Sequence, residues 1–199
     1  MSVLKSKVAF ITGAAGGIGQ AIAVEYAKQG ASVAVADIAS GEATVAAIQR
    51  AGGTAMAVSC DVSREDSVNA AVAAVKKAYG TIDVLVNVAG LVPKAWPAVD
   101  EMTADLWDRT FGVNIRGMFL CVKAVVPIMK SAKRGKILNI SSATTFLGLP
   151  NACAYVASKS AVIGFSRSIA RELGASNIQV NVITPGLIPT TPGVSASGL

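Results

Sequence analysis

Histidine is absent from this chain of 199 residues, and cysteine, aromatic side chains and charge are scarce. Without histidine a Ser-His-Asp triad is impossible, and we expect no zinc or other metal site. Any proton transfer must therefore use other groups. The three cysteines, Cys60, Cys121 and Cys153, are widely spaced and form no C-x-x-C pair, which favours a reducing cytoplasm over a disulfide framework.

Long hydrophobic runs are also missing. The longest candidate, residues 117–129, is interrupted by Lys123, so we predict no transmembrane segment and no membrane partner. Charged residues make up only 15% of the chain and hydrophobic ones 52%, a composition that excludes general disorder. The length fits one domain with a substantial core.

The net charge of +6 raises the question of a nucleic-acid partner. Four basic residues cluster before an apolar run: Lys130, Lys133, Arg134 and Lys136. Because no aromatic residue is interleaved with them, we interpret the cluster as a solvated turn and expect no nucleic-acid binding.

The stretch ITGAAGGIG, residues 11–19, can be interpreted in three ways. Two lysines precede it and a cleavage-like A-I-A follows it, as in a secretion signal, while Gly13 and Gly17 have the spacing of packed membrane helices. Four glycines in seven residues, however, make a poor hydrophobic helix. The third interpretation is a loop that cradles a phosphate, and the rest of the sequence favours it.

Six short apolar segments, rich in Val and Ile, alternate with helical patterns. They span residues 7–12, 32–37, 54–60, 82–87, 136–141 and 178–184. Such strands imply a parallel sheet buried on both faces, and right-handed crossovers then give a doubly wound, Rossmann-like α/β fold. We predict one catalytic domain over residues 1–189, followed by a mobile tail over 190–199.

Helix signals lie between the strands. Ser63 and Asp66 predict the start of one helix, and Gly80 supplies its stop. Pro127 falls late in a helical pattern that begins near Ala104, and we expect it to kink or end that helix.

The glycine stretch follows the first strand and begins the first helix, where free backbone N–H groups and the helix dipole favour a pyrophosphate. Its spacing, G-x-x-x-G-x-G, differs from the G-x-G-x-x-G fingerprint, so a second signal is needed. Asp37 supplies it, because it ends the second strand and can accept hydrogen bonds from both ribose hydroxyls. No Lys or Arg stands at Ala14, Ala15 or Ile38 to balance a 2′-phosphate, so NAD is favoured over NADP.

The helix expected to begin near Ala154 carries an inward stripe made of Val162, Ser166, Ile169 and Leu173. Tyr155 and Lys159 extend this stripe, so a phenol and an ammonium group share one face, one turn apart. The lysine cation and a positive nicotinamide ring would stabilise a phenolate, which lets Tyr155 exchange a proton with an alcohol. Ser142, at the end of the fifth strand, could hydrogen-bond the same oxygen.

In this order the motifs resemble those of the short-chain dehydrogenase/reductase family. Residues 12–19, TGAAGGIG, match its TGxxxGIG cofactor loop, and residues 155–159, YVASK, match its YxxxK active site. The resemblance runs from Val8 to Thr190 and implies a role for each matching residue.

By this resemblance Tyr155 is the acid/base, and Lys159 lowers its pKa and holds the nicotinamide ribose. Ser142 orients the carbonyl or hydroxyl, and Asn114 anchors a proton-relay water. The implied cofactor-binding residues are Gly13, Gly17, Ile18, Gly19, Asp37, Asp61, Val62, Asn87, Ala89, Gly90, Tyr155, Lys159, Pro185, Gly186, Ile188 and Thr190.

Two features depart from the family's usual pattern. The fourth strand ends in N-V-A-G, where the family usually has two asparagines, which affects one local hydrogen bond. The chain also ends at Leu199, where relatives usually continue through a substrate-covering segment, a helix and a seventh strand. We expect a truncated or naturally short form, with an open sheet edge at residues 178–184 and poor turnover. Two long helices, residues 104–129 and 154–173, correspond to a dimer contact of relatives, so we expect a homo-oligomer.

Taken together, these patterns predict hydride transfer between NAD and a secondary alcohol or ketone. The residues expected to line the substrate pocket are apolar and favour a hydrophobic or cyclic alcohol: Val92, Trp96, Phe146, Leu147, Leu149 and Leu187. Two alternatives stay open. One is a 3-oxoacyl-carrier-protein reductase, which the basic surface suits but Asp37 opposes; the other is a nucleotide-binding form with little turnover.

Overall fold

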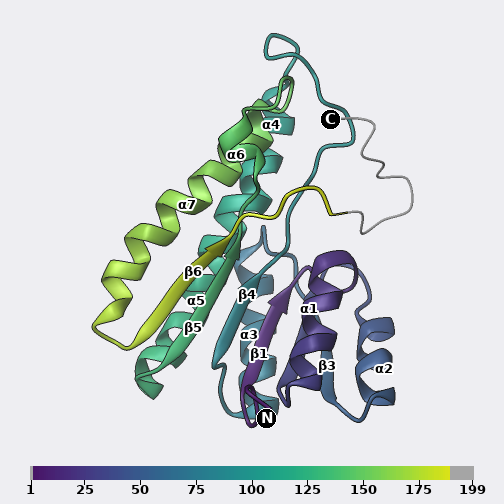
Figure 1. The fold of residues 1–199 in the computed structure, drawn as a ribbon, viewed down its shortest axis with the longest axis vertical. Coiled ribbons are helices and arrows are strands. Elements are labelled where there is room, and N and C mark those ends of the chain that lie inside the picture. Colours follow the sequence, from purple (N-terminus) through teal and green to yellow (C-terminus); the bar gives the residue numbers. More distant parts are fainter. Residues whose placement is uncertain (1, 189–199) are drawn as a thin grey trace.

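Six parallel strands form one sheet in the order β3-β2-β1-β4-β5-β6 (Figure 1). The computed structural model describes residues 2–188. The strands are β1 (Val8–Thr12), β2 (Ser32–Asp37), β3 (Thr54–Ser59), β4 (Val84–Asn87), β5 (Gly135–Ile140) and β6 (Ile178–Ile183). The strand order reverses between β1 and β4, because β1 pairs with β2 on one side and with β4 on the other. This is the doubly wound topology that the sequence predicts.

Helices cover both faces of the sheet. They are α1 (Gly17–Lys28), α2 (Glu42–Arg50), α3 (Glu65–Tyr79), α4 (Ala104–Phe111), the π-helix η1 (Gly112–Gly117), α5 (Met118–Ala132), α6 (Thr144–Leu147) and α7 (Cys153–Gly174). One core joins the sheet to α1 and α2, through residues such as Ala23 and Ile48. The other joins it to α3, α5 and α7, through residues such as Val72, Val125 and Leu173.

Burial on both faces is confirmed only for the central strands. Every residue of β1 and β4 is buried, as are the four middle residues of β2. The edge strands differ: no residue of β3 is fully buried, and β6 alternates buried or half-buried residues with exposed ones. β3 and β6 are the edges of the sheet, and each lacks a neighbouring strand on one side. Their apolar composition suggested burial on both faces, because composition does not show which strands lie at an edge.

The start of α3 lies within two residues of its predicted position and its predicted end is confirmed, but the predicted cap by Ser63 is not formed. The helix begins at Glu65, and no side chain caps it. The Ser63 hydroxyl instead donates to the carboxylate of Asp61 over 2.6 Å, because that acceptor is only two residues away. Gly80 ends the helix in the left-handed conformation, with φ of 79°.

Pro127 does not end its helix, since α5 continues to Ala132. The carbonyl group that loses its partner belongs to Lys123, because proline has no N–H group to donate. By length and apolar composition the continuous helical segment Ala104–Ala132 could cross a membrane. It nevertheless buries Leu120, Val125 and Met129 in the core against the sheet, as a core helix of a folded domain does.

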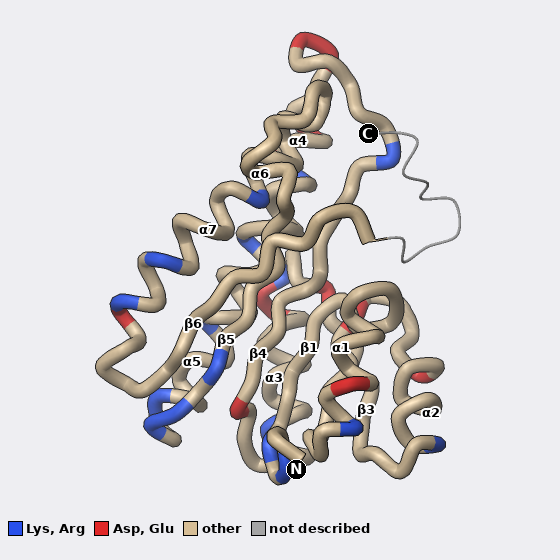
Figure 2. Tube along the Cα trace, in the orientation of Figure 1, with Lys and Arg blue, Asp and Glu red and all other residues tan. Residues whose placement is uncertain are grey.

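The basic cluster lies at the turn between α5 and β5, at the opposite end of the sheet from α6 (Figure 2). Its members are all exposed: Lys130, Lys133, Arg134 and Lys136. Arg134 pairs with the buried carboxylate of Asp83 over 3.0 Å. The predicted turn is therefore confirmed.

Candidate active site

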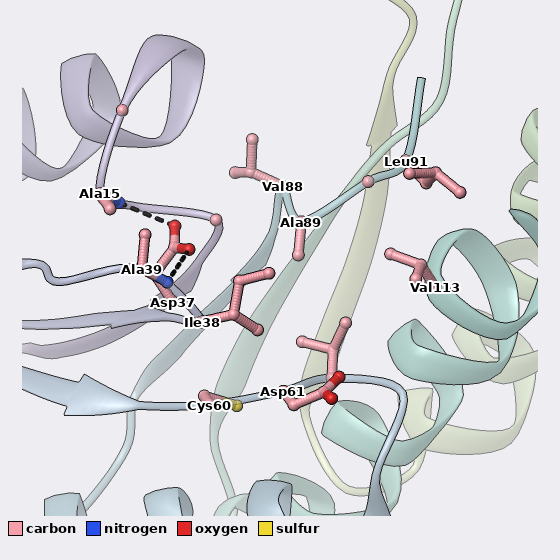
Figure 3. A pocket seen from close by; sticks show the side chains of 14 residues that line it. Ala15, Asp37, Ile38, Ala39, Cys60, Asp61, Val88, Ala89, Leu91 and Val113 are labelled. Carbon is pink, nitrogen blue, oxygen red and sulfur yellow. Dashed lines mark hydrogen bonds between the residues drawn. The ribbon is translucent and has the colours of Figure 1, made fainter. Parts of the chain in front are cut away.

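A cleft of about 550 Å³ opens where β1 and β4 end, at the point where the strand order reverses (Figure 3). Ligands of open α/β sheets bind in this position. The cleft brings together six of the predicted cofactor residues: Gly13, Asp37, Asp61, Val62, Ala89 and Gly90. Eight further residues line it, several of them next in sequence to a predicted one: Ala15, Gly16, Ile38, Ala39, Cys60, Val88, Leu91 and Val113.

The glycines of the first loop have different tasks. A Cβ atom at Gly13, where φ is +67°, would lie 2.8 Å from the backbone of Ala89. One at Gly19 would overlap the carbonyl group of Gly13, whereas one at Gly16 would meet nothing within 4 Å. Gly13 and Gly19 thus allow close packing, and Gly16 leaves space above the start of α1. No side chain caps that helix, so its first N–H groups suit an anionic phosphate.

Asp37 ends β2 with its carboxylate held by two backbone N–H groups (Figure 3). Ala15 donates to one oxygen over 2.9 Å and Ala39 to the other over 3.0 Å. The side chain therefore has a fixed position on the cleft wall, where its second lone pairs can accept ribose hydroxyls. On the same wall, burial raises the pKa of Cys60 to about 11, with a smaller contribution from Asp61, so this thiol is unreactive.

Tyr155 and Lys159 lie on α7, on the same face as Val162 and Leu173, as the stripe predicts. Lys159 is only 4% exposed, and its Nζ atom donates to the carbonyl oxygen of Ile140 over 2.9 Å. The same Nζ atom lies 5.9 Å from the centre of the Tyr155 ring. Burial lowers the pKa of Lys159 to about 8. The ammonium group is thus held against the phenol.

The sequence predicts a lowered pKa for Tyr155 when both the Lys159 ammonium and a positive nicotinamide ring lie nearby, and only the first of these belongs to this chain. Burial raises the Tyr155 pKa, and the nearby Ser142 hydroxyl opposes that shift only in part. Desolvation of the phenolate is the largest contribution to this shift. A positive charge placed near the phenol would oppose this rise in the pKa.

Ser142 follows β5 and is 8% exposed. The backbone on either side of Ser142 is bonded to the end of β6 and the residues that follow it: the N–H of Ser141 donates to the carbonyl of Ile183, and the N–H of Ala143 donates to that of Pro185. Thr144 donates its hydroxyl to Ser142 Oγ over 2.9 Å. Pro185 is thus connected to the loop that carries Ser142.

Asn114 is fully buried in η1, the π-helix that interrupts the long helix. Its Oδ1 accepts from the N–H of Leu91 over 2.6 Å, while its Nδ2 donates to Leu91 O and to Ser158 Oγ. These bonds use both Nδ2 protons and one lone pair of Oδ1, so a water can bind this amide only through the second lone pair of Oδ1. Ser158, which sequence reasoning missed, also donates to the backbone carbonyl of Tyr155 over 2.8 Å.

The remaining predicted residues lie around the cleft or apart from it. Gly17 and Ile18 begin α1, and Gly186 and Ile188 follow Pro185 after β6. Asn87 is buried between strands and donates to Asn139 over 2.8 Å. Thr190 lies outside the described residues. Thr12 was also missed: its hydroxyl accepts from the N–H groups of Val88 and Ala89, which fixes the loop after β4.

Comparison with known proteins identifies this arrangement. The short chain dehydrogenase profile matches residues 7–197. The chain belongs to the short-chain dehydrogenase/reductase family. It is 41% identical to D-threitol dehydrogenase of Mycolicibacterium smegmatis, over 97% of this chain and 74% of that protein. It is 38% identical to 3beta-hydroxysteroid dehydrogenase of Mediterraneibacter gnavus, over 93% of this chain and 67% of the other.

The same fold occurs in a solved structure of NAD⁺-bound xylitol dehydrogenase, with a TM-score of 0.88 and 35% identity over 92% of this chain and 71% of that one. As a short-chain dehydrogenase/reductase, this protein is an oxidoreductase that interconverts an alcohol and a ketone with a nicotinamide cofactor. Its residues fit that cofactor, because glycines leave space at the start of α1 and Asp37 stands on the cleft wall.

The buried lysine predicts how stability depends on pH. The Lys159 pKa falls from 10.5 to about 8 on folding, so between these values the unfolded chain binds more protons and stability rises with pH. The free energy of unfolding of the wild type, relative to Lys159→Met, should rise by about 3 kcal/mol between pH 8 and 10.5. Urea unfolding of both proteins measures it, and a difference that does not change with pH would contradict the burial of a titrating lysine.

Proposed function

We propose that this protein is an NAD-dependent dehydrogenase of hydrophobic or cyclic secondary alcohols. The observation that carries the proposal is that one cleft joins two groups of residues. Asp37 lines the cleft, and Gly90, which also lines it, lies next to Lys159, whose ammonium group is 5.9 Å from the centre of the Tyr155 ring. The alternative of a 3-oxoacyl-carrier-protein reductase is opposed by Asp37, because that activity usually uses NADP. The filled catalytic positions oppose a form that only binds nucleotide.

In this proposal each polar residue has one task. Tyr155 takes the proton of the substrate hydroxyl during oxidation and returns it during reduction. Ser142 donates a hydrogen bond to the same substrate oxygen and so holds it near the phenol. The nicotinamide ring, when bound, supplies the hydride acceptor and a positive charge. The Lys159 ammonium, 5.9 Å from the ring centre, would act together with that charge against the rise in the Tyr155 pKa that burial causes.

Preference for NAD is supported by the position of Asp37. Its carboxylate is anchored by two backbone N–H groups and cannot turn away from a 2′-phosphate. The neighbouring wall residues Ala15, Ile38 and Ala39 carry no positive charge. Two negative groups would then meet in a cleft of reduced dielectric, which disfavours NADP.

An apolar substrate is supported by the residues beside Tyr155. The indole ring of Trp96 meets the Tyr155 ring edge to face, with 5.7 Å between the ring centres and an angle of 88° between the planes. Phe146 and Leu147 follow Ser142 on α6 and are more than 70% exposed, at 74% and 72%. No charged residue occurs in the segment 141–152 that carries them. An alcohol with an apolar body can cover these side chains.

We also propose a cytoplasmic homo-oligomer that associates through α4, α5 and α7. Trp107 on α4 and Phe119 on α5 are 38% and 44% exposed, which supports a contact there. Cys60 and Cys121 are free and buried, as suits a reducing compartment.

For cofactor choice, we expect NAD to be preferred over NADP by at least about 2 kcal/mol, because the Asp37 carboxylate repels the 2′-phosphate. Asp37→Asn keeps the size of the side chain and removes its charge, so it should narrow that difference. Calorimetric dissociation constants for both cofactors measure the effect. Equal constants in the wild type would contradict the proposed role.

For catalysis, Tyr155→Phe should lower kcat at least about 100-fold, because it removes the proton-transferring group. The dissociation constant of NAD should change little. Steady-state oxidation of cyclohexanol and cofactor binding by calorimetry measure the two quantities. Normal turnover by Tyr155→Phe would mean that another group transfers the proton.

For substrate class, kcat/KM should be higher for cyclohexanol than for threitol. Trp96→Ala should reduce the value for cyclohexanol roughly tenfold, since an aromatic contact is lost, and reduce that for propan-2-ol less than about threefold. Tyr79→Ala on α3 is the control for the loss of a partly buried aromatic ring, because Tyr79 packs against the core and belongs to no contact proposed above. A preference for threitol in the wild type would reject an apolar substrate.

A further inference from the structure

Thr44 on α2 is a buried hydroxyl that contacts the first glycine loop from behind the cleft. Its side chain is 0% exposed, and its Oγ1 donates to the carbonyl oxygen of Ala14 over 3.0 Å. Gln20 on α1 donates its Nε2 to the same Oγ1, also over 3.0 Å. A single hydroxyl therefore joins α2, α1 and the loop between β1 and α1.

The sequence around α2 makes this contact possible. A Cβ atom at Gly41, the residue before the helix, would lie 2.7 Å from Cγ1 of Val35 on β2. Only glycine therefore allows the start of α2 to approach the sheet this closely. The approach brings Thr44, in the first turn of α2, within reach of Ala14.

The contact completes the anchoring of the loop. Ala14 is 0% exposed, and its N–H donates to the carbonyl of Ala36 on β2 over 3.4 Å. Its own carbonyl is paired by Thr44, and the next N–H, of Ala15, is paired by Asp37. Without the hydroxyl, a buried carbonyl group would lack a partner and the loop would gain alternative conformations.

We propose that Thr44 is a positioning residue for dinucleotide binding. It is not among the residues that line the cleft, so it acts on the loop and not on the ligand. By fixing the peptide between Ala14 and Ala15, it holds the N–H groups at the start of α1 toward the cleft before the cofactor binds. A preorganised loop loses less conformational entropy on binding. The inference rests on the proposed function, because it requires a dinucleotide in this cleft.

The test compares three variants by calorimetric titration with NAD. Thr44→Val removes the hydroxyl at nearly constant volume and should raise the dissociation constant about tenfold. Thr44→Ser keeps the hydroxyl and should bind within about twofold of the wild type. Thr110→Val is the matched control: Thr110 is also 0% exposed, but its hydroxyl bonds to Leu106 within α4. This control should leave the dissociation constant unchanged.

Two further measurements separate positioning from general stability. Hydrogen exchange of residues 13–20 should be faster in Thr44→Val than in Thr110→Val or the wild type. At saturating NAD, kcat of Thr44→Val should stay within about threefold of the wild type, and NADP binding should weaken in proportion to NAD binding. A lowered Tm with unchanged exchange and an unchanged dissociation constant would overturn the proposal.

Gln20→Leu keeps the test decisive if Thr44→Val does not fold, because it removes the donor to Thr44 Oγ1 but leaves the hydroxyl. We expect a dissociation constant raised about threefold, and an unchanged value would then overturn the inference. If the wild type itself binds no NAD, the proposed function fails. The exchange rates of residues 13–20 would still report whether Thr44 fixes the loop.

Discussion

The site depends on keeping an ammonium group buried without a carboxylate partner. Lys159 bonds to the carbonyl of Ile140, and no carboxylate within residues 2–188 pairs with it. Its pKa of about 8 records what this burial costs. Helix α7 can carry such a group because it is fastened to β5, where the Ser141 hydroxyl donates to the Lys159 carbonyl over 2.7 Å. Since one carbonyl satisfies only one of three N–H donors, the others remain available beside Tyr155.

The loop after β4 connects this cation to the cofactor cleft. Ala89 lies against Gly13 on one side, and a Cβ atom at Gly90 would lie 3.4 Å from both Lys159 Nζ and Asn114 Oδ1. Asn114 in turn holds both backbone groups of Leu91. A shift of this loop would therefore move the cleft wall and the surroundings of Lys159 together. The loop after β4 therefore contacts the cofactor cleft through Ala89 and the surroundings of Lys159 through Gly90. Both residues are small because the loop is packed closely on both sides.

Hydrophobic periodicity and glycine placement in the sequence predicted the strand positions and the shared face of Tyr155 and Lys159. The six strands lie within about two residues of their predicted positions, and Tyr155 and Lys159 share the predicted face, because periodicity and glycine placement are properties of short segments. The π-helix was not predictable in this way, since Asn114 is held by Leu91 and Ser158, which are 23 and 44 residues distant. The rise in the Tyr155 pKa that burial causes was not predictable for a related reason: it depends on how much surrounding protein excludes water, which residue spacing does not give.

A buried polar chain explains how three elements stay in register behind the site. Asn87 on β4 donates to Asn139 on β5, and Asn139 donates to Ser166 on α7. The Ser166 hydroxyl donates to the carbonyl of Val162. Because its proton is used there, Ser166 accepts from Asn139, and the donor and acceptor in each of these side-chain hydrogen bonds are fixed. One acceptor is then left over, and Asn87 Oδ1 is the buried side-chain atom without a partner among the described residues. An apolar contact would tolerate sliding of one element past another, whereas these bonds exist in one register only. Because β4 and β5 lead to Gly90 and Ser142, and α7 carries Lys159, these bonds fix the relative positions of the segments that carry the active-site residues.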